Sequence, residues 1–249
     1  TAGGDPSYVV LNSTGAVSVT GAIGTDIGTL TLTNSGGATF GGAVTTGTSV
    51  VISNTTGTVA FNAALTTPTL TVTAGSYNLG LNATGTSITN AVTFNNTGTL
   101  ALGASGGTQT YAGGITATAP SATTVKGTIN STNAAMTFGA LTLGANTVLN
   151  TNATNNSADI TVGAITGSSY DLTMSTGSGV TGADVNGTSF NGTGALTLSN
   201  IGGTASFTGA VTAASLVVEN TVNNVSLTGT SGTITNAVTF GNTGTLTLG

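Results

Sequence analysis

Residues 88–103 read ITNAVTFNNTGTLALG and residues 234–249 read ITNAVTFGNTGTLTLG, so that fourteen of the sixteen positions are identical. Apolar and hydroxyl residues alternate in both copies, as in Val92-Thr93-Phe94. This period of two is that of a β-strand with one buried face. The sequence Asn-Thr-Gly, which is typical of a turn, separates two alternating runs. The segment therefore predicts short strands joined by tight turns, in a unit that the chain repeats.

A looser unit contains the end of this segment. It consists of Gly-x-Leu-x-Leu, then Gly-Gly, then an aromatic residue, then Val or Ile followed by Thr, and it occupies residues 28–45, 98–116 and 194–212. Its first part occurs again from Gly244, so the copies begin at clearly unequal intervals. An array of β-sandwiches would give regular domains of about 100 residues with linkers. The uneven spacing favours a solenoid instead, in which the repeated feature falls on some coils only.

The sequence thus predicts an all-β chain in which residues 1–249 form one continuous parallel β-solenoid (β-helix), which we expect to be right-handed. Coils of about 20 to 25 residues would give about ten to twelve short coils stacked about 4.8 Å apart. Leu, Val and Ile would then form a continuous buried stripe that no single coil could bury. Tandem β-sandwich domains are the alternative architecture.

The composition excludes several classes of function. The chain has one Lys, six Asp or Glu, no His and no Cys, and only 3% of it is charged. A nucleophile paired with His, a thiolate and the usual zinc sites are therefore missing, as is the positive charge needed to hold nucleic acid. No apolar run approaches the ~20 residues of a membrane helix. We expect no enzyme, no catalytic, cofactor-binding or metal-binding residue, no cofactor, no nucleic-acid partner and no membrane span.

Three carboxylates are spaced regularly. Asp159, Asp171 and Asp184 follow one another at nearly equal intervals, and they would line up if coils were as short as those intervals. A ladder of carboxylate oxygens would bind calcium. However, the Gly-Gly-x-Gly-x-Asp repeat of calcium-binding rolls is absent. The sequence favours solvated Asp residues in turns.

The single lysine suggests one covalent possibility. Lys126 could form an isopeptide bond to Asn or Asp with help from Glu219, which is the only Glu. No motif supports this bond, and a solvated turn lysine is the favoured interpretation.

Runs of Thr-x-Thr suggest an ordered surface. Residues 29–33 read TLTLT and residues 69–73 read TLTVT, and stacked coils would place their methyl and hydroxyl groups in a flat array of the kind that binds ice. Thr is also simply a good residue for the exposed face of a strand. Asn is expected to fill turns or to stack in amide ladders. The Phe and Tyr residues are expected to fill the core at solenoid corners instead of forming a sugar-stacking strip.

The two ends of the sequence match each other. Placed end to start they read GTLTLG-TAGGDPSY, which has the spacing of GTLALGASGGTQTY at residues 98–111 and sets Tyr8 at the place of Tyr111. We therefore expect these 249 residues to be one period of a longer repetitive array, or a unit whose Gly249 end joins the Thr1 end of the next.

The segments GTLTLTNSGGATFGGAVT, GTLALGASGGTQTYAGGIT and GALTLSNIGGTASFTGAVT resemble the low-complexity repeats of very large bacterial surface proteins. These include filamentous-haemagglutinin-like adhesins, autotransporter passengers and β-strand-repeat cell-surface proteins. The resemblance extends over nearly the whole chain and is one of composition and repeat style. It implies a parallel β-helix shaft, export to the cell surface, and a role in adhesion, matrix or sheath. No amino-terminal targeting module of those families is recognisable.

The sequence thus predicts a structural protein at the extracellular cell surface, the shaft of a filament, adhesin stalk or sheath, built by end-to-end stacking. Its expected partner is itself, as a head-to-tail homopolymer or as covalent tandem repeats, and a cell-surface or matrix polysaccharide is a further candidate partner. The alternative is an ice- or polysaccharide-binding module that uses ordered Thr arrays.

Overall fold

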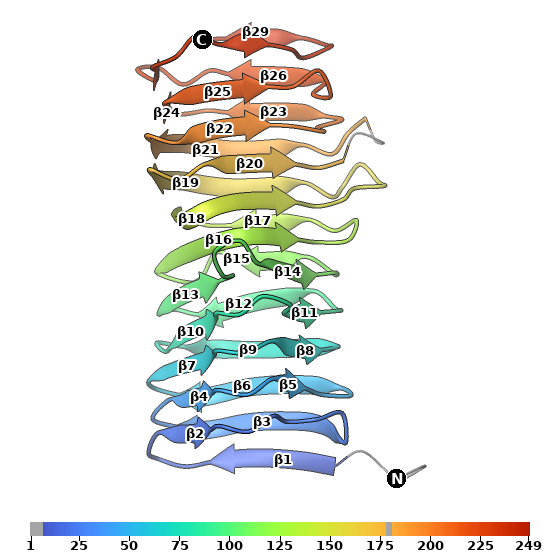
Figure 1. Ribbon diagram of the computed structural model, residues 1–249, viewed down its shortest axis with the longest axis vertical. Helices are drawn as coiled ribbons and strands as arrows, with labels where there is room; N and C mark the ends of the chain where they lie inside the picture. The colour runs from blue at the N-terminus through green and yellow to red at the C-terminus, as the bar shows by residue number, and fades with distance from the viewer. Residues whose placement is uncertain (1–6, 178–180) are drawn as a thin grey trace.

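The computed structural model describes residues 7–177 and 181–249, and its regular structure there consists of 29 β-strands without a helix. The strands are parallel and stack into a β-solenoid of about 11 turns. Figure 1 shows them as successive layers along the long axis, with β1 at one end and β29 at the other. The predicted parallel β-solenoid is confirmed, and the alternative of tandem β-sandwich domains is wrong.

Each coil passes through three columns of strands, which we call faces A, B and C in the order in which the chain visits them. Face A contains β1(Ser7–Asn12), β3(Ile27–Ser35), β6(Ser49–Thr55), β9(Thr69–Gly75), β12(Val92–Asn96), β15(Ile115–Ala117), β17(Met136–Phe138), the first parts of β19(Ile160–Ser168) and β21(Val185–Gly192), β23(Thr204–Phe207), β26(Asn224–Leu227) and β29(Leu246–Leu248). Face B contains β2(Val17–Val19), β4(Ala38–Phe40), β7(Thr58–Phe61), β10(Asn78–Leu81), β13(Thr99–Leu102), the first parts of β16(Ala122–Asn130) and β18(Leu141–Asn150), the second parts of β19 and β21, β24(Val211–Ala213) and β27(Thr233–Ile234). Face C contains β5(Val44–Thr45), β8(Leu65–Thr67), β11(Ser87–Ile88), β14(Thr108–Tyr111), the second parts of β16 and β18, β20(Leu172–Ser175), β22(Ala195–Leu198), β25(Ser215–Val218) and β28(Thr239–Phe240).

Coil length varies around the predicted value. Ser35 and Thr55, which bond to each other between adjacent coils, are 20 positions apart in the sequence, whereas Asp159 and Asp184 do so 25 positions apart. The shortest step is smaller still and joins Thr123 to its partner Leu141. Eleven turns at about 4.8 Å per strand give a rod about 50 Å long. Part of the variation is taken up by register shifts, as between Val125 and Gly127 where β16 passes from face B to face C beside β18.

The main core is an apolar column inside the solenoid, as the repeat pattern predicts, and a small separate cluster is formed by Ala153, Ala158 and Ala183. Phe40 and Phe61 stack in adjacent coils with ring centroids 4.6 Å apart, and Phe94 meets Tyr111 edge-on at 6.3 Å. The expectation that aromatic residues fill the core is confirmed for most of them, namely Phe40, Phe61, Tyr77, Phe94, Tyr111, Phe138, Phe190 and Phe207. Tyr8 is an exception, because 73% of its surface is exposed.

Polar side chains line the corners. Asn occupies corner positions with positive φ, a backbone conformation that Asn tolerates better than most residues, at Asn34, Asn54, Asn133, Asn152 and Asn200. Ladders of side chains cross between coils at the surface and in the interior. The amide of Asn82 donates to Oδ1 of Asn62 (3.1 Å), and the buried hydroxyls of Ser35 and Thr55 lie 2.7 Å apart.

The repeated sequence unit moves by one face from copy to copy. Its Gly-x-Leu-x-Leu part forms β3 on face A in the copy from Gly28, β13 on face B in the copy from Gly98, and β22 on face C in the copy from Gly194. In the copy from Gly244 it forms β29, on face A again. Each spacing between successive copies of the unit therefore corresponds to a whole number of coils plus one third of a coil. One sequence can build any of the three faces.

Candidate functional site

The structure separates the three regularly spaced carboxylates. A coil is longer than the interval between neighbouring members of the set, so Asp171 lies beside face C while Asp159 and Asp184 precede paired strands on face A. Each of the last two accepts a backbone hydrogen bond from the next coil: the N–H of Asp184 donates to Oδ1 of Asp159 (2.8 Å), and the N–H of Thr204 donates to Oδ1 of Asp184 (2.6 Å). Within residues 7–177 and 181–249, no group of three or more acidic side chains is placed to hold a metal ion.

Asn residues make the same contact elsewhere. Oδ1 of Asn78 accepts from the N–H of Thr99, and Oδ1 of Asn224 accepts from the N–H of Thr245, both at 2.8 Å. The neutral amide thus accepts the same bond as the carboxylate at a similar distance, so the geometry requires an acceptor oxygen and no charge. The Asp side chains thus connect coils, in agreement with the turn role that the sequence favours.

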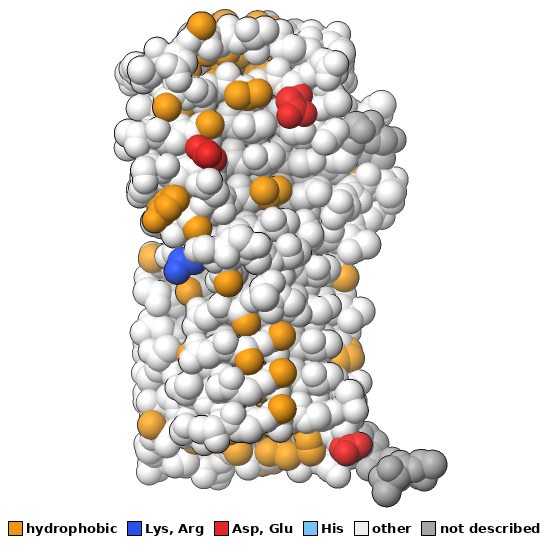
Figure 2. Space-filling model, viewed as in Figure 1, with side chains coloured by type: hydrophobic (Ala, Val, Ile, Leu, Met, Phe, Trp, Pro, Cys, Tyr) orange, Lys and Arg blue, Asp and Glu red, His pale blue; other side chains and the backbone are white. Residues whose placement is uncertain are grey.

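The lysine and the glutamate are far apart. Lys126 lies in β16, and Glu219 follows β25, about four coils further along the axis, or about 19 Å. Glu219 accepts a hydrogen bond from the hydroxyl of Ser199 (2.6 Å). The isopeptide arrangement that requires both residues is therefore not assembled. Figure 2 shows charged side chains as isolated spots on an otherwise uncharged surface.

The outward-facing Thr residues form an array on part of one face. On β3, β6 and β9 of face A the outward positions pair in register over three coils. Further along face A the outward residues continue as a single column, from Thr93 to Thr116 and Thr137. The two-dimensional array is therefore limited to eight hydroxyl residues around an apolar centre, Val51. The eight are Thr29, Thr31, Thr33, Ser49, Ser53, Thr69, Thr71 and Thr73.

At the end near the N-terminus of the chain, no described strand pairs with the outer side of β1. Val9 and Leu11 of β1 point towards the core, and with other apolar residues they line a groove of about 450 Å³ on the end surface. Beside it, Val10 exposes 60% of its surface. In Figure 2 orange side chains gather along this lower edge. The groove is lined by Val9, Leu11, Val19, Ala22, Ile23, Gly24, Asp26 and Ile27.

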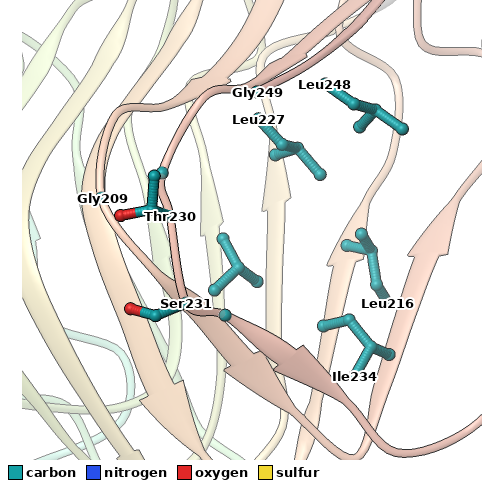
Figure 3. Close-up of a pocket in the computed structure, with 11 residues that line it drawn as sticks. Gly209, Leu216, Leu227, Thr230, Ser231, Ile234, Leu248 and Gly249 are labelled. Atoms are coloured by element: carbon teal, nitrogen blue, oxygen red, sulfur yellow. The ribbon is translucent and has the colours of Figure 1, made fainter.

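The other end is open as well. A groove of about 440 Å³ lies between the last coil and the coil beneath it. Figure 3 shows Leu216, Leu227, Ile234 and Leu248 directed into this groove, with Thr230 and Ser231 at its rim. The last strand, β29, lacks a neighbour on its outer side among the described residues.

The near-identical segments have different surroundings at this end. In the internal copy, Leu100 and Leu102 each expose 1% of their surface, because β16 covers β13 on its outer side. In the terminal copy, the equivalent Leu246 and Leu248 expose 39% and 59%. The same sequence therefore occurs once covered by a further coil and once uncovered.

The predicted match between the two ends of the sequence involves residues 1–8, of which the structure describes Ser7 and Tyr8. Thr1 and the Gly3-Gly4 pair lie outside the described residues. Tyr8 is described, and it does not take the place of Tyr111, because β1 turns Val9 and Leu11 inward and leaves Tyr8 exposed while Tyr111 is fully buried. Val9, Val10 and Leu11 are all apolar, so the sequence holds no alternation that marks which of them face inward.

Comparison of the chain with protein-family models, with curated proteins and with solved structures finds no match. Across residues 7–177 and 181–249 the structure contains no helix long and apolar enough to cross a membrane. The surfaces that stand out are thus the two open ends of the solenoid.

Proposed function

We propose that this chain is a structural protein that forms the shaft of an extracellular filament, adhesin stalk or surface sheath, and that copies of it stack end to end. One observation carries the proposal. The sequence that is covered by a further coil at residues 88–103 recurs uncovered at residues 234–249, so the last coil has the side chains of a coil that another coil covers.

The two ends of the solenoid are complementary because all of its strands are parallel. A stack of parallel strands presents opposite edges at its two ends, and each edge carries unpaired backbone N–H and C=O groups. The edge of β29 can therefore pair with the edge of an opening coil such as that of β1 and β2, in a head-to-tail contact. Because such a contact uses two different surfaces, it does not close on itself and produces a linear polymer. The junction is a non-covalent contact or a continuous chain.

Apolar burial would drive the contact. Stacking would remove apolar surface from water at both ends of the solenoid. This surface belongs to Leu246 and Leu248 at one end and to the groove residues Val9 and Leu11 at the other. Full burial of one such side chain contributes about 1.5 to 3 kcal/mol. The scarcity of charge also favours long stacks, since identical charges repeated along a column would repel one another, whereas Thr and Asn do not.

The surface location rests on the resemblance of the repeats to those of bacterial surface proteins. A wall of hydroxyl and amide groups is also suited to contact with polysaccharide, which is the second proposed partner.

Electron microscopy and sedimentation of the purified chain test the proposal. We expect rods that lengthen with protein concentration in steps of about 50 Å, the length of one solenoid. Particles that stay about 50 Å long at every concentration would refute stacking of separate chains. In that case two copies joined by a Gly249–Thr1 peptide bond must form one rod of twice the length, and two rods at variable angles would refute the continuous form as well.

The array of hydroxyl groups on β3, β6 and β9 favours a second candidate function, the binding of ice or polysaccharide. A thermal-hysteresis assay and a glycan array distinguish this function. Activity in either assay by a chain that remains monomeric, lost on Thr31→Leu and kept on Thr142→Leu of face B, would favour it over the shaft.

A further inference from the structure

The open ends of the solenoid are steps and not flat surfaces. The chain rises by one strand spacing, about 4.8 Å, for each passage through faces A, B and C. At the upper end the last described strands are β27 on face B, β28 on face C and β29 on face A. An even rise through the three faces sets each of them about one third of a spacing above the one before. At the lower end the first strands among the described residues are β1 on face A and β2 on face B, and Ile23 then bridges to Val44 on face C.

Only one rotational setting lets a second copy continue all three columns. Without rotation, β1 meets β29 on face A, but β2 then lies two spacings above β27, and face C has the same gap of about 10 Å. With two thirds of a turn, β1 meets β28 and β2 meets β29, and the gap remains above β27. With one third of a turn, β1 meets β27, β2 meets β28, and the segment around Ile23 meets β29, each at one spacing.

We propose, on the basis of the stacking proposed above, that a second copy of this chain docks with a rotation of one third of a turn, so that its face A continues face B of the copy below. Successive copies then wind around the axis, and every third copy regains the starting orientation. The corresponding rise is about eleven and one third strand spacings, or about 54 Å, per copy.

The side chains agree with this setting. Val17-Ser18-Val19 of β2 comes to lie over Val238-Thr239-Phe240 of the copy below, with Val over both apolar residues and a hydroxyl residue over Thr239. The equivalent internal strand, β12, is covered in the same manner: Ile115 pairs with Val92, and Thr116 pairs with Thr93. An apolar residue thus again covers an apolar one and a hydroxyl residue a hydroxyl one.

The interior of the chain already contains shifts of this kind. The unit that begins at Gly28, Gly98, Gly194 and Gly244 advances by one third of a coil at each occurrence. A copy docked at one third of a turn would continue this progression across the junction. Equivalence of the three faces is what allows the rotated copy to fit.

Thiol cross-linking tests the rotation, because the chain has no Cys and introduced thiols are its only ones. In the proposed setting Ser18 lies over Thr239, so the variant S18C/T239C should give a ladder of covalent multimers with a short bismaleimide, at the expense of the monomer band. Two matched controls report the other settings: S18C/T247C reports two thirds of a turn, and V10C/T247C reports no rotation. All four positions are exposed, so these substitutions should leave the fold intact.

Filament formation is followed in parallel by electron microscopy without cross-linker. A ladder from either control in place of S18C/T239C overturns the one-third turn and leaves stacking in place. Filaments without a ladder in any variant also overturn it. Absence of filaments together with absence of ladders overturns the stacking itself, so the two proposals fail in different ways.

Discussion

The paired segments allow one substitution to be compared in two surroundings. Leu102 exposes 1% of its surface and its counterpart Leu248 exposes 59%. Leu102→Ala should lower the free energy of unfolding by about 2 to 5 kcal/mol, as for a core leucine. Leu248→Ala in the separate chain should cost only about 1 kcal/mol, because less than half of a side chain whose full burial is worth about 1.5 to 3 kcal/mol is covered.

Leu248→Ala should have a larger effect on filament assembly than on the stability of the separate chain. Stacking would bury the rest of Leu248, which is worth about 1 to 2 kcal/mol. Since about 1.4 kcal/mol corresponds to a tenfold change in an equilibrium constant, Leu248→Ala should raise the critical concentration for assembly about 5- to 30-fold. Chemical denaturation measures the first effect, and sedimentation of polymer at a series of concentrations measures the second.

A wall residue provides the control. Val217 in β25 exposes 42% of its surface but lies on the side of the solenoid, where stacking does not cover it. Val217→Ala should therefore leave the critical concentration unchanged. Equal shifts for Val217→Ala and Leu248→Ala, or no shift for either, would show that the exposed leucine does not take part in assembly.

Three further predictions concern the stability of the single chain. The Tyr111 hydroxyl donates to Oε1 of buried Gln109 (2.8 Å), so Tyr111→Phe, which leaves that oxygen unpaired, should lower the free energy of unfolding by about 1 to 3 kcal/mol, measured by urea denaturation. An unchanged urea midpoint would contradict this. Asp184→Asn keeps an acceptor for the N–H of Thr204 and should be nearly neutral, whereas Asp184→Ala should cost about 1 kcal/mol; a larger loss for Asn than for Ala would mean that the charge matters. Burial raises the pKa of Tyr77 from 10.0 to about 12, so the folded chain holds this proton more tightly than the unfolded one. The contribution of Tyr77 to stability should therefore be constant below pH 10 and be lost between pH 10 and 12. Stability should fall less steeply with pH in Tyr77→Phe than in the unsubstituted chain, and an equal slope in both proteins would contradict this role of Tyr77.

The fold could be predicted from the sequence because each local signal agrees with the whole. The alternation in Val92-Thr93-Phe94 and the turn formers between such runs determine short strands, and the uneven copies of the Gly-x-Leu-x-Leu unit distinguish a solenoid from separate domains. Aromatic residues at recurrent positions proved to be core residues, with Phe40 and Phe61 stacked between coils.

The features that escaped prediction depend on coil length and on the local register of single strands. Asp159 and Asp184 line up because the coil that separates them is a long one, whereas the coil from Thr123 to Leu141 is short, and the sequence carries no marker of that difference. The register of β1 escaped for another reason. Val9, Val10 and Leu11 are all apolar, so their residue types do not show which of them face inward, and the likeness of the two ends of the chain favoured the register that sets Tyr8 at the place of Tyr111.

The equivalence of the three faces has a consequence for the gene. Recombination between the two near-identical segments, which begin at Ile88 and Ile234, would delete or duplicate a stretch that is not a whole number of coils but a whole number of thirds. A solenoid with distinct faces would be left with mismatched columns after such an event. Here the Gly-x-Leu-x-Leu unit occurs on all three faces, so unequal crossing-over between such units would shorten or lengthen the solenoid by thirds of a coil and keep that unit in a setting that it already occupies.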